Sequence, residues 1–338
     1  MSQPLFRRTL LALSLAAFAT GAMAQQKAGK AAAPAPAAKL NWPTKPVRIL
    51  VGFPCGSTPD LVARTIAEPL SRALGQPVIV DNRPGAGGNI AADMVAKATD
   101  EHTIGVMING NMTIAKMLNP ATPFDPLRDL APISLIGTAP LLLTAPATAP
   151  FNTAQEFFLA ARNGGNKWSY GSPAVGTVGH IGMELLKTKT NMDPVHVPYP
   201  GNPQVINALI GGQIQLSLLP PGLAAAQIRA GKLKAVGVTS SSRSPLVPEY
   251  PSLDEGGIRG FQLEIWTAAA APASMPKPIV AKLSALISEI ARTPEVRQKL
   301  FQQGWQVAGT SSEGLANRIK ADTATLGGVI VMRGIKAE

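Results

Sequence analysis

Short apolar runs alternate with amphipathic stretches along most of the chain, and glycine, proline and polar residues separate them. The first apolar run, VRILVGF at 47–53, leads through the turn PCGST into a stretch with helical spacing, PDLVARTIAEPL at 59–70. A second unit repeats this order with PVIV at 77–80, the turn DNRPGAGG and the helix NIAADMVAKA at 89–98. With a third apolar run that ends at Ile108, the order predicts parallel strands joined by right-handed helical crossovers.

The same order of elements returns in the second half of the chain. Strands are predicted at 168–172, 194–199, 214–219 and 233–239, with helices at 180–187, 203–210 and 223–230. Three further helices are predicted in the tail, at 276–291, 294–304 and 312–331. We expect these tail helices to pack on the first lobe.

Two apolar, extended segments, 135–146 and 258–272, separate the two repeats of this order. They predict a hinge of two strands that cross between lobes. The predicted fold is therefore α/β with two lobes, each a mostly parallel sheet flanked by helices. We assign residues 44–140 plus 265–338 to lobe 1 and residues 141–264 to lobe 2.

The N-terminus has the pattern of an export signal. Arg7 and Arg8 precede an apolar run at 10–18 and the small-residue cleavage pattern at 22–24, so residues 1–24 are predicted to be a cleaved signal peptide. The paired arginines fit both the general secretory route and the twin-arginine route. Residues 25–43 are rich in Ala, Pro and Lys and are predicted to form a disordered linker.

Composition narrows the classes of partner. The formal net charge of +11 falls to +6 on the folded body once the five basic residues of the first 39 are left out, and Lys and Arg are scattered singly. Scattered charges and an aromatic content of 5% argue against nucleic-acid binding and fit a mild attraction for anions. The single cysteine, Cys55, excludes an intramolecular disulfide. We expect a monomer without a cofactor.

Several segments resemble one known family. They are WPTKPVRILVGFPCGSTPDLVAR at 42–64, DNRPGAGGNIAADMVAKA at 81–98, TPFDPLRDLAPISLI at 122–136, YGSPAVGTVGHIGMELLK at 170–187 with HVPYPG at 196–201, and WTAAAAPASMPKPIVAKL at 266–283. The chain is similar in these segments to the extracytoplasmic solute receptors of tripartite tricarboxylate transporters, often called Bug receptors. The similarity covers nearly all of the predicted mature chain in the same order.

The resemblance implies a function as well as a fold. It implies a periplasmic binding protein of the type II-like, two-lobed kind, which closes on a small organic anion (a mono-, di- or tricarboxylate or an acidic amino acid) without performing chemistry on it. It also implies that loop backbone and ordered water from both lobes hold one ligand carboxylate, and that membrane permease subunits receive the ligand. A ligand-binding sensor for a signalling partner would use the same cleft and stays open as an alternative.

The first strand-to-helix turn is the first candidate wall of the site. Its candidate ligand-binding residues are Phe53, Cys55, Gly56, Ser57, Thr58 and Asp60. The start of a helix exposes unpaired N–H groups and a positive dipole end, which suits a carboxylate. Asp60 would repel an anion, so a role in holding the loop is weighed beside a ligand contact. The family usually has a proline and two or more glycines before a Thr-Asp pair, whereas this chain has Cys55, Ser57 and an intervening Pro59.

The second turn and the end of the third strand add further candidates to the same edge. Gly87, Gly88 and Asn89 form half of a dinucleotide fingerprint, but Ile90 stands where its third glycine would be. We interpret this turn as a wall of the ligand cleft, with ordinary turn geometry as the alternative. Asn111, or its neighbour Asn109, could orient a ligand through its amide.

The opposite wall is predicted in the second lobe. The candidates there are Ser172, Gly176, Thr177, His180 and Tyr199. His180 could donate to a carboxylate, and its alternative role is that of a helix cap or a packed side chain. An enzyme is the least favoured class, because the chain has no GxSxG motif and the histidines at 102, 180 and 196 lack the spacing of metal ligands.

Overall fold

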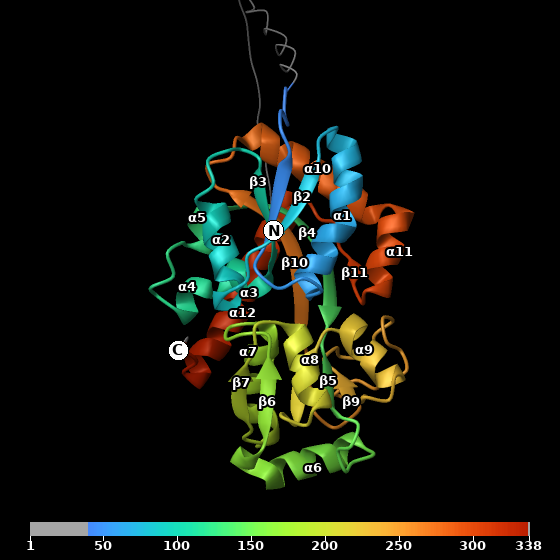
Figure 1. The fold of residues 1–338 in the computed structure, drawn as a ribbon. Helices are drawn as coiled ribbons and strands as arrows, with labels where there is room; N and C mark the ends of the chain where they lie inside the picture. Colours follow the sequence, from blue (N-terminus) through green and yellow to red (C-terminus); the bar gives the residue numbers. More distant parts are fainter. Residues whose placement is uncertain (1–39, 337–338) are drawn as a thin grey trace, which may run out of the picture. The chain divides into compact units, whose positions relative to one another are not determined.

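The structure is a computed structural model, and it describes residues 40–336. These residues build two β-sheets with helices around each (Figure 1). We call the part that carries the six-stranded sheet lobe 1 and the part that carries the five-stranded sheet lobe 2. The predicted signal peptide at 1–24 and most of the predicted linker lie outside the described residues.

The sheet of lobe 1 combines strands from both ends of the chain. Its order is β11 (Gln306–Val307), β4 (Leu130–Pro140), β10 (Glu264–Pro272), β3 (Thr103–Ile108), β1 (Val47–Val51) and β2 (Val78–Asn82). β1 pairs in parallel with β2 and β3, whereas β10, β4 and β11 join by antiparallel pairing. The parallel part is the strand-helix repeat that the sequence predicts.

The sheet of lobe 2 has a similar plan. Its order is β7 (Val195–Pro198), β6 (Ser169–Ser172), β8 (Leu216–Leu219), β5 (Leu142–Pro146) and β9 (Leu233–Val238). β6 pairs in parallel with β7 and β8, and β5 pairs antiparallel with β8 and β9. The two-lobed α/β fold is confirmed, but both sheets are mixed rather than mostly parallel. The reason is that β10 and β5, which run antiparallel to both of their neighbours, each enter their sheet from the other lobe and not by a helical crossover within one lobe.

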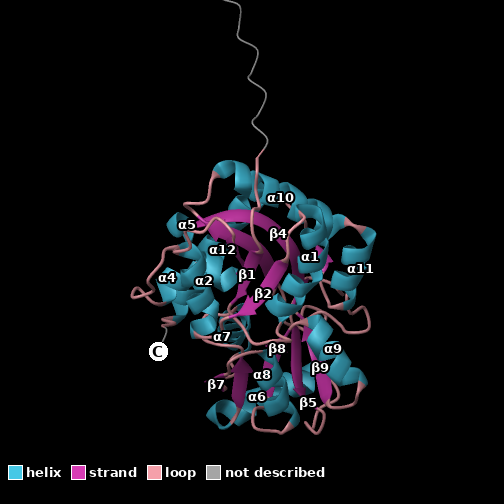
Figure 2. Cartoon of the chain, turned by 45° about the horizontal axis from the view of Figure 1, so that its top comes forward, coloured by secondary structure: helices cyan, strands magenta, loops and turns pink. Residues whose placement is uncertain are grey.

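Helices lie on the outside of both sheets (Figure 2). Those that begin in lobe 1 are α1 (Thr58–Leu74), the short 3-10 helix η1 (Ala86–Gly88), α2 (Asn89–Ala96), α3 (Asn109–Thr113), α4 (Ala115–Leu118), α5 (Pro126–Asp129), α10 (Lys277–Arg292), α11 (Pro294–Gln302) and α12 (Ser312–Arg333). Those of lobe 2 are α6 (Ala154–Gly164), the 3-10 helix η2 (Gly165–Lys167), α7 (Val178–Thr190), α8 (Asn202–Ile210) and α9 (Pro221–Arg229).

Helix α1 shows how the local sequence sets an element that borders the site. Val62, Ile66 and Leu70 recur at intervals of four, so they form one apolar face, and all three are fully buried in the core of lobe 1. Pro59 stands in the first turn, where its missing N–H costs no hydrogen bond, and Gly75 ends the helix at φ 69°. The apolar face thereby fixes which way the helix start points.

Helix α6 was missing from the sequence-based prediction. Thr153 accepts a hydrogen bond from the Glu156 N–H, and Glu156 accepts one from the Asn152 N–H. This reciprocal pattern marks a helix start, and its Thr-x-x-Glu spacing can be read from the sequence. The helix buries Phe157 and Phe158 beneath the sheet of lobe 2.

The C-terminal helix α12 corrects the expectation that the tail packs on lobe 1 alone. Leu315 and Ile319, near its start, belong to a core cluster of lobe 1. Leu326 and Ile330, about two to four turns later, belong to the core cluster of lobe 2. The helix therefore crosses between the lobes, in addition to the β4–β5 passage and β10.

The ordered part of the chain begins before residue 44. Trp42 is buried in the lobe 1 core, and its indole N–H donates to the Glu101 carbonyl at 2.9 Å. Residues 40–43, which the sequence assigned to a disordered linker, thus include a packed side chain. The Ala, Pro and Lys content of the segment predicts a linker, but the single large apolar side chain of Trp42 is enough to anchor its end in the core. The lobe boundaries at 140/141 and 264/265 stay predictions.

Candidate functional site

A cavity lies between the two lobes, and we call it the interlobe cavity. Its volume is about 50 Å³, measured as the space open to the centre of a water molecule. Its lining comes from the ends of strands and the starts of helices in both lobes: Phe53, Ser57, Thr58, Pro59, Ile108, Asn109, Leu141, Pro173, Thr177, Val178, Gly179, Asn202, Leu218, Pro220, Ile265, Trp266 and Trp305. The carboxyl ends of parallel strands are where open α/β sheets bind ligands.

Four helices begin at this cavity. The lining includes the first residues of α1, α7 and α8 and the residue that precedes α9. Their N-cap residues are Ser57, Thr177, Gly201 and Pro220. Within residues 40–336, none of these four forms a side-chain hydrogen bond to an N–H group of its helix start. The starts of α1, α7 and α8 thus present unpaired N–H groups and positive dipole ends toward one space, which favours an anion, whereas α9 begins with Pro220 and Pro221, which have no N–H.

Two asparagines add unpaired oxygens to the lining. Asn109 is 1% exposed, and its Nδ2 donates to the Glu264 carbonyl at 3.2 Å. Asn202 is 6% exposed, and its Nδ2 donates to Thr58 Oγ1 at 3.1 Å. The Oδ1 atoms of both have no hydrogen-bond partner among residues 40–336. Buried polar atoms are nearly always paired, so these two oxygens are available to a donor on a water or on a bound molecule.

The rest of the lining is apolar and uncharged. No Asp, Glu, Lys, Arg or His occurs among the described residues that line the cavity. Trp266 and Trp305 are buried, and the Trp266 indole N–H donates to Asp322 of α12. The cavity can therefore hold an anion through N–H groups and hydroxyls, without a formal counter-charge.

The lobes touch around the cavity. The Asn202–Thr58 hydrogen bond joins lobe 2 to lobe 1. Gly222, at the start of α9, approaches residue 303 after α11 so closely that a Cβ on it would lie 1.9 Å from the Gln303 carbonyl oxygen. A Cβ on Gly110 of lobe 1 would likewise lie 2.7 Å from the Gly176 carbonyl oxygen of lobe 2. These approaches describe a closed cleft.

The predicted site residues fall into three groups: those that line the interlobe cavity, those that line a second hollow, and those that line neither. Phe53, Ser57, Thr58 and Thr177 line the interlobe cavity. Gly87, Gly88, Asn89 and Tyr199 line a second, wider hollow of about 630 Å³ between the lobes. Cys55, Gly56, Asp60, Asn111, Ser172, Gly176 and His180 line neither.

Asn111 supports the second turn from behind. Its Nδ2 donates to the Gly87 carbonyl and to Asn89 Oδ1, both at 2.8 Å. A Cβ on Gly88 would lie 2.8 Å from the Phe53 ring, so this glycine lets the second turn approach the first. The two turns of lobe 1 are thus packed against each other, with the cavity on one side and the wider hollow on the other.

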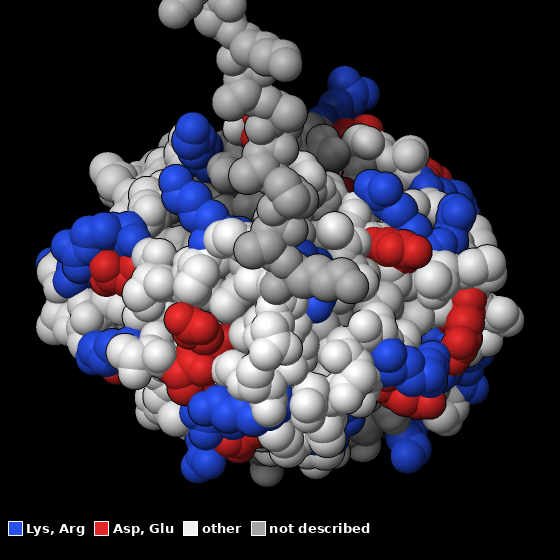
Figure 3. Space-filling view, turned by 90° about the horizontal axis from the view of Figure 1, so that it is seen from above, with Lys and Arg blue, Asp and Glu red and all other residues white. Residues whose placement is uncertain are grey.

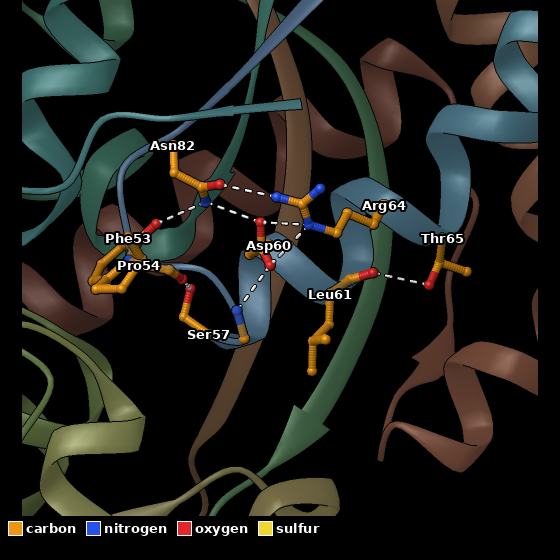
Figure 4. Close-up of polar contacts among 9 residues, drawn as sticks. Phe53, Pro54, Ser57, Asp60, Leu61, Arg64, Thr65 and Asn82 are labelled. Carbon is orange, nitrogen blue, oxygen red and sulfur yellow. Dashed lines mark hydrogen bonds and ion pairs between the residues drawn. The ribbon is translucent and has the colours of Figure 1, made fainter. Parts of the chain in front are cut away.

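Asp60 holds the first turn in place (Figure 4). Its carboxylate accepts from the Gly56 N–H at 2.9 Å, from Arg64 Nε at 3.0 Å and from Asn82 Nδ2 at 2.9 Å. Burial works against ionisation, but the bonds from Arg64, Gly56 and Asn82 outweigh it and hold the pKa of Asp60 below its usual range. The geometry matches the loop-holding alternative for Asp60, while Cys55 lies exposed on the outside of the turn.

A buried polar group in lobe 2 takes up the remaining candidates. We call Tyr170, His180, Glu184, Lys187 and His196 the histidine cluster. The imidazoles of His180 and His196 stack with centroids 4.0 Å apart, and Tyr170 stacks on His196 at 4.8 Å. Burial lowers the pKa of His180 to about 4 and that of His196 to about 3, so both rings are neutral at pH 7.

Among the described residues, the hydrogen-bond and ion-pair partners of the histidine cluster lie inside lobe 2 or on α12. His180 Nδ1 accepts from the Gly176 N–H at 3.2 Å, and Ser172 Oγ lies 2.7 Å from His196 Nε2. Glu184 accepts from the Tyr170 hydroxyl at 2.7 Å and pairs with Lys187 and Arg333, each at 3.1 Å. His180 is thus packed in this cluster, which fits its alternative role, and a contact with a ligand stays a prediction.

Several residues that line the cavity are not among the sequence-based candidates. The sequence contains a signal that could have identified Asn202, because Asn202-Pro203 starts a helix with a polar residue and a proline, as Thr58-Pro59 does. Asn109 was weighed beside Asn111 and not selected. Trp266 and Trp305 reach the cavity from β10 and from the segment after α11, and no local pattern announces this.

Comparison with known proteins agrees with this geometry. The family model described as the tripartite tricarboxylate transporter family receptor matches residues 62–335. The chain belongs to this receptor family. A relative from Pseudomonas sp. strain P51, the UPF0065 protein in the tcbD-tcbE intergenic region, is 35% identical over 284 residues, which cover 83% of this chain and 84% of the relative.

Solved structures of the receptor family superpose on the chain. The periplasmic binding protein BugD has a TM-score of 0.83 at 30% identity, covering 88% of this chain and all of that one. MatC from Rhodopseudomonas palustris with bound malate has a TM-score of 0.80 at 32% identity, covering 86% of this chain and all of that one. BugD is named as a periplasmic binding protein, and the family is one of solute receptors rather than of enzymes.

Other features of the receptor's described residues concern membranes, metals and charge. Within residues 40–336, no helix is both long and apolar enough to cross a membrane, and no cluster of His, Cys, Asp and Glu could hold a metal ion. Figure 3 shows the face on the side of α10, where basic and acidic side chains are interspersed. This mixture is typical of a solvated surface.

Proposed function

We propose that the chain is a periplasmic receptor that binds a small organic carboxylate between its lobes and delivers it to a tripartite tricarboxylate-type membrane permease. It performs no chemistry on the ligand. The observation that carries this proposal is the convergence of three uncapped helix starts on one cavity whose described lining holds no acidic side chain. Unpaired N–H groups in a buried cavity recognise a carboxylate strongly.

Closure of the lobes supplies the signal for delivery. The lining comes from both lobes, so a ligand in the cavity contacts both and favours the closed form by its differential affinity for it. The Asn202–Thr58 hydrogen bond and the close approach of Gly222 to residue 303 belong to this closed form. The permease then distinguishes a loaded receptor from an empty one by the lobe arrangement.

A ligand panel tests the binding step. The purified protein is titrated calorimetrically with acetate, lactate, succinate and citrate, with glucose as a neutral compound and putrescine as a cation. We expect saturable binding of at least one carboxylate, recovered unchanged by NMR, and ligand at about 100 times its Kd stabilises the fold by roughly 2.7 kcal/mol. Binding of glucose or putrescine without binding of any carboxylate contradicts the proposal.

A variant ties the binding to the cavity. Thr58→Val removes the hydroxyl that accepts from Asn202, so we expect affinity to fall at least tenfold, or about 1.4 kcal/mol. Thr325→Val is the matched control, because its hydroxyl bonds only within α12, to the Ala321 carbonyl. Equal affinity of the two variants removes Thr58 from the site.

Uptake tests the delivery step. Cells that carry the permease are given the isotope-labelled carboxylate that binds in the panel, with and without the receptor gene. We expect uptake to require the receptor, and the Thr58→Val protein to support less of it. Receptor-independent uptake by the same permease contradicts delivery while leaving binding intact.

A further inference from the structure

Four side chains connect the wall of the interlobe cavity to the C-terminal helix α12. They are Glu264 and Trp266 of β10 and Arg318 and Asp322 of α12, and we call them the hinge network. Resting on the proposed function, we propose that Arg318 and Asp322 are positioning residues for ligand binding. Neither of them lines the cavity. They fix two residues that do, Trp266 and Asn109, in the orientations that the ligand meets.

The first connection runs through the Trp266 ring. Trp266 is fully buried and lines the cavity. Its indole has one hydrogen-bond donor and no acceptor, and this N–H donates to the Asp322 carboxylate. The ring therefore offers the cavity its carbon atoms and not its N–H. An apolar side chain at position 322 would leave the N–H buried without an acceptor, so the ring would no longer be held in this orientation.

Arg318 holds the two acids of the hinge network together. Its Nε donates to Asp322 Oδ1 at 2.9 Å, and its Nη2 donates to Glu264 Oε2 at 3.2 Å. A guanidinium is planar and can serve two carboxylates at once in a fixed geometry. Arg318 thus sets the position of the acceptor that holds Trp266 and, at the same time, the position of Glu264.

The second connection runs from Glu264 to the Asn109 amide. The backbone carbonyl of Glu264 accepts from Asn109 Nδ2 at 3.2 Å, while its carboxylate is held by Arg318. Because a carbonyl can only accept, this bond turns the NH₂ group of Asn109 toward Glu264 and leaves the amide oxygen on the other side. Asn109 lines the cavity, and its Oδ1 has no partner among residues 40–336. The network therefore orients a second residue of the cavity wall.

The hinge network lies where the chain passes between the lobes. Glu264 is the first residue of β10, and it pairs with Pro140, the last residue of β4. The two α12 members of the network lie between Leu315, which belongs to a core cluster of lobe 1, and Leu326, which belongs to that of lobe 2. The same bonds thus join the helical passage to the two strand passages and shape the cavity wall.

A double-mutant cycle tests whether Asp322 acts through Trp266. Asp322→Leu removes the acceptor, Trp266→Phe removes the donor but keeps an aromatic wall, and a third protein carries both changes. Each protein is titrated calorimetrically with acetate, lactate, succinate and citrate. We expect Asp322→Leu to lower the affinity for the acid that binds the unaltered protein by about fivefold or more. In the Trp266→Phe background the same change should cost less than about twofold, because the donor is already gone.

Two further variants separate positioning from a general loss of structure. Asp322→Asn keeps an oxygen that can accept from the indole N–H, so its affinity should stay within about threefold of the unaltered protein. Glu68→Leu is the matched control, because it breaks an exposed pair with Arg72 one turn along α1, and it should stay within about twofold. If Asp322→Leu weakens binding equally in both backgrounds, or if Asp322→Asn binds no better than Asp322→Leu, the positioning role is overturned while the carboxylate receptor stands.

A measurement without ligand tests the orientation of the ring directly. The difference in near-UV circular dichroism between the unaltered protein and Trp266→Phe gives the contribution of Trp266 in its fixed surroundings. We expect Asp322→Asn to keep most of this contribution and Asp322→Leu to lose about half or more. An unchanged spectrum of Asp322→Leu overturns the proposal. If none of the four acids binds the unaltered protein, the proposed function fails, and the spectra still decide whether Asp322 positions Trp266.

Arg318→Lys tests the same network if Asp322→Leu does not fold. An ammonium keeps the positive charge but cannot serve both carboxylates in the geometry of the guanidinium. We expect this variant to lose part of the Trp266 contribution to the spectrum and to bind the acid about threefold or more weakly. A spectrum and an affinity equal to those of the unaltered protein would overturn the role of Arg318.

Discussion

Two groups of buried polar side chains in this receptor differ in whether their hydrogen bonds are complete. The histidine cluster of lobe 2 contains charges, yet its tyrosine, glutamate and lysine bond to one another and to Arg333. The interlobe cavity contains no charged side chain in its described lining, yet two of its amide oxygens lack partners. A network of bonded, buried side chains holds a fold together, whereas the unpaired oxygens of Asn109 and Asn202 can accept from a molecule in the cavity.

The comparison also corrects an intuition about chemistry. Histidine, serine and glutamate are the residue types most readily assigned to a site, and the sequence placed Ser172 and His180 there. In the structure Ser172 hydrogen-bonds to His196, and His180 accepts from Gly176 and stacks on His196, all inside lobe 2. Asparagine and threonine side chains and helix starts line the interlobe cavity, which is the carboxylate site of the proposed function.

Acidification should give the largest difference between the two regions, because it should destabilise the histidine cluster without weakening ligand binding in the interlobe cavity. The unfolded histidines gain protons near pH 6.5, but His180 and His196 stay neutral in the fold until about 4 and about 3. The unfolded state therefore binds more protons in this window, and stability falls as pH falls, by about 1.4 kcal/mol per pH unit for each histidine. Between pH 6 and 4.5 the pair should cost about 4 kcal/mol.

The groups that face these imidazoles are Glu184, Lys187 and Tyr170, with Arg333 reaching Glu184 from α12. Urea unfolding across pH 8 to 4.5 measures the loss, and the His196→Gln variant should reduce its slope. The described cavity lining has no titratable group, so affinity for a carboxylate that stays ionised should not change between pH 8 and 6. A flat stability profile between pH 6 and 4.5 would contradict the assignment of neutral, buried rings.

Blocking closure should have the next largest effect, and only on binding. Gly222→Ala places a Cβ against the Gln303 carbonyl, where backbone cannot yield, so the lobes should be unable to meet. We expect affinity to fall about a hundredfold, or about 2.8 kcal/mol, with the melting temperature of the unliganded protein nearly unchanged. Gly328→Ala is the control, because nothing lies within 4 Å of its Cβ position. Calorimetry that finds both variants equal to the parent protein would show that closure is not needed.

Weakening the histidine cluster should lower the stability of the fold and leave ligand affinity unchanged. Glu184→Gln keeps the shape of the side chain but loses its charge toward Lys187 and Arg333, so we expect the free energy of unfolding to fall by about 2 kcal/mol. Affinity should stay within twofold. Glu295→Gln, in an exposed pair with Lys299, should change stability by less than about 0.5 kcal/mol. A large affinity change in Glu184→Gln with unchanged stability would reverse the roles of the two regions.

The smallest effect should come from Cys55, although it marks the departure from the family pattern in the first turn. Its side chain is exposed and lines neither hollow. Cys55→Ser should therefore change stability and affinity by less than about 0.5 kcal/mol each. A tenfold loss of affinity, measured by calorimetry beside the Thr58→Val protein, would show that the outer side of the turn contacts the ligand.

Most elements could be predicted because their patterns are local. The strand at Val47–Val51 and the helix at Thr58–Leu74 follow from an apolar run, a polar turn and an apolar face with helical spacing. The crossing of α12 could not be predicted. Its apolar residues Leu315 and Leu326 have the same periodic pattern, and periodicity does not say which lobe each will meet.

The candidate site likewise contains features that the sequence could predict and features that it could not. Asn109 and Asn111 both follow the third strand and look equivalent in sequence. On α3 they are two residues apart, so they face nearly opposite directions. Asn111 therefore meets the glycine turn, whereas Asn109 meets the cavity.

By itself, the sequence determined the two strand-helix repeats, the family and the helix starts that suit an anion, because each depends on neighbouring residues or on a run of matching segments. The tertiary structure decided which polar atoms remain unpaired. Asn109 and Asn202 lie in different lobes, and Trp266 and Trp305 reach the cavity from segments distant in the chain. An unpaired atom is a property of all the residues packed around it, so no local pattern can reveal it.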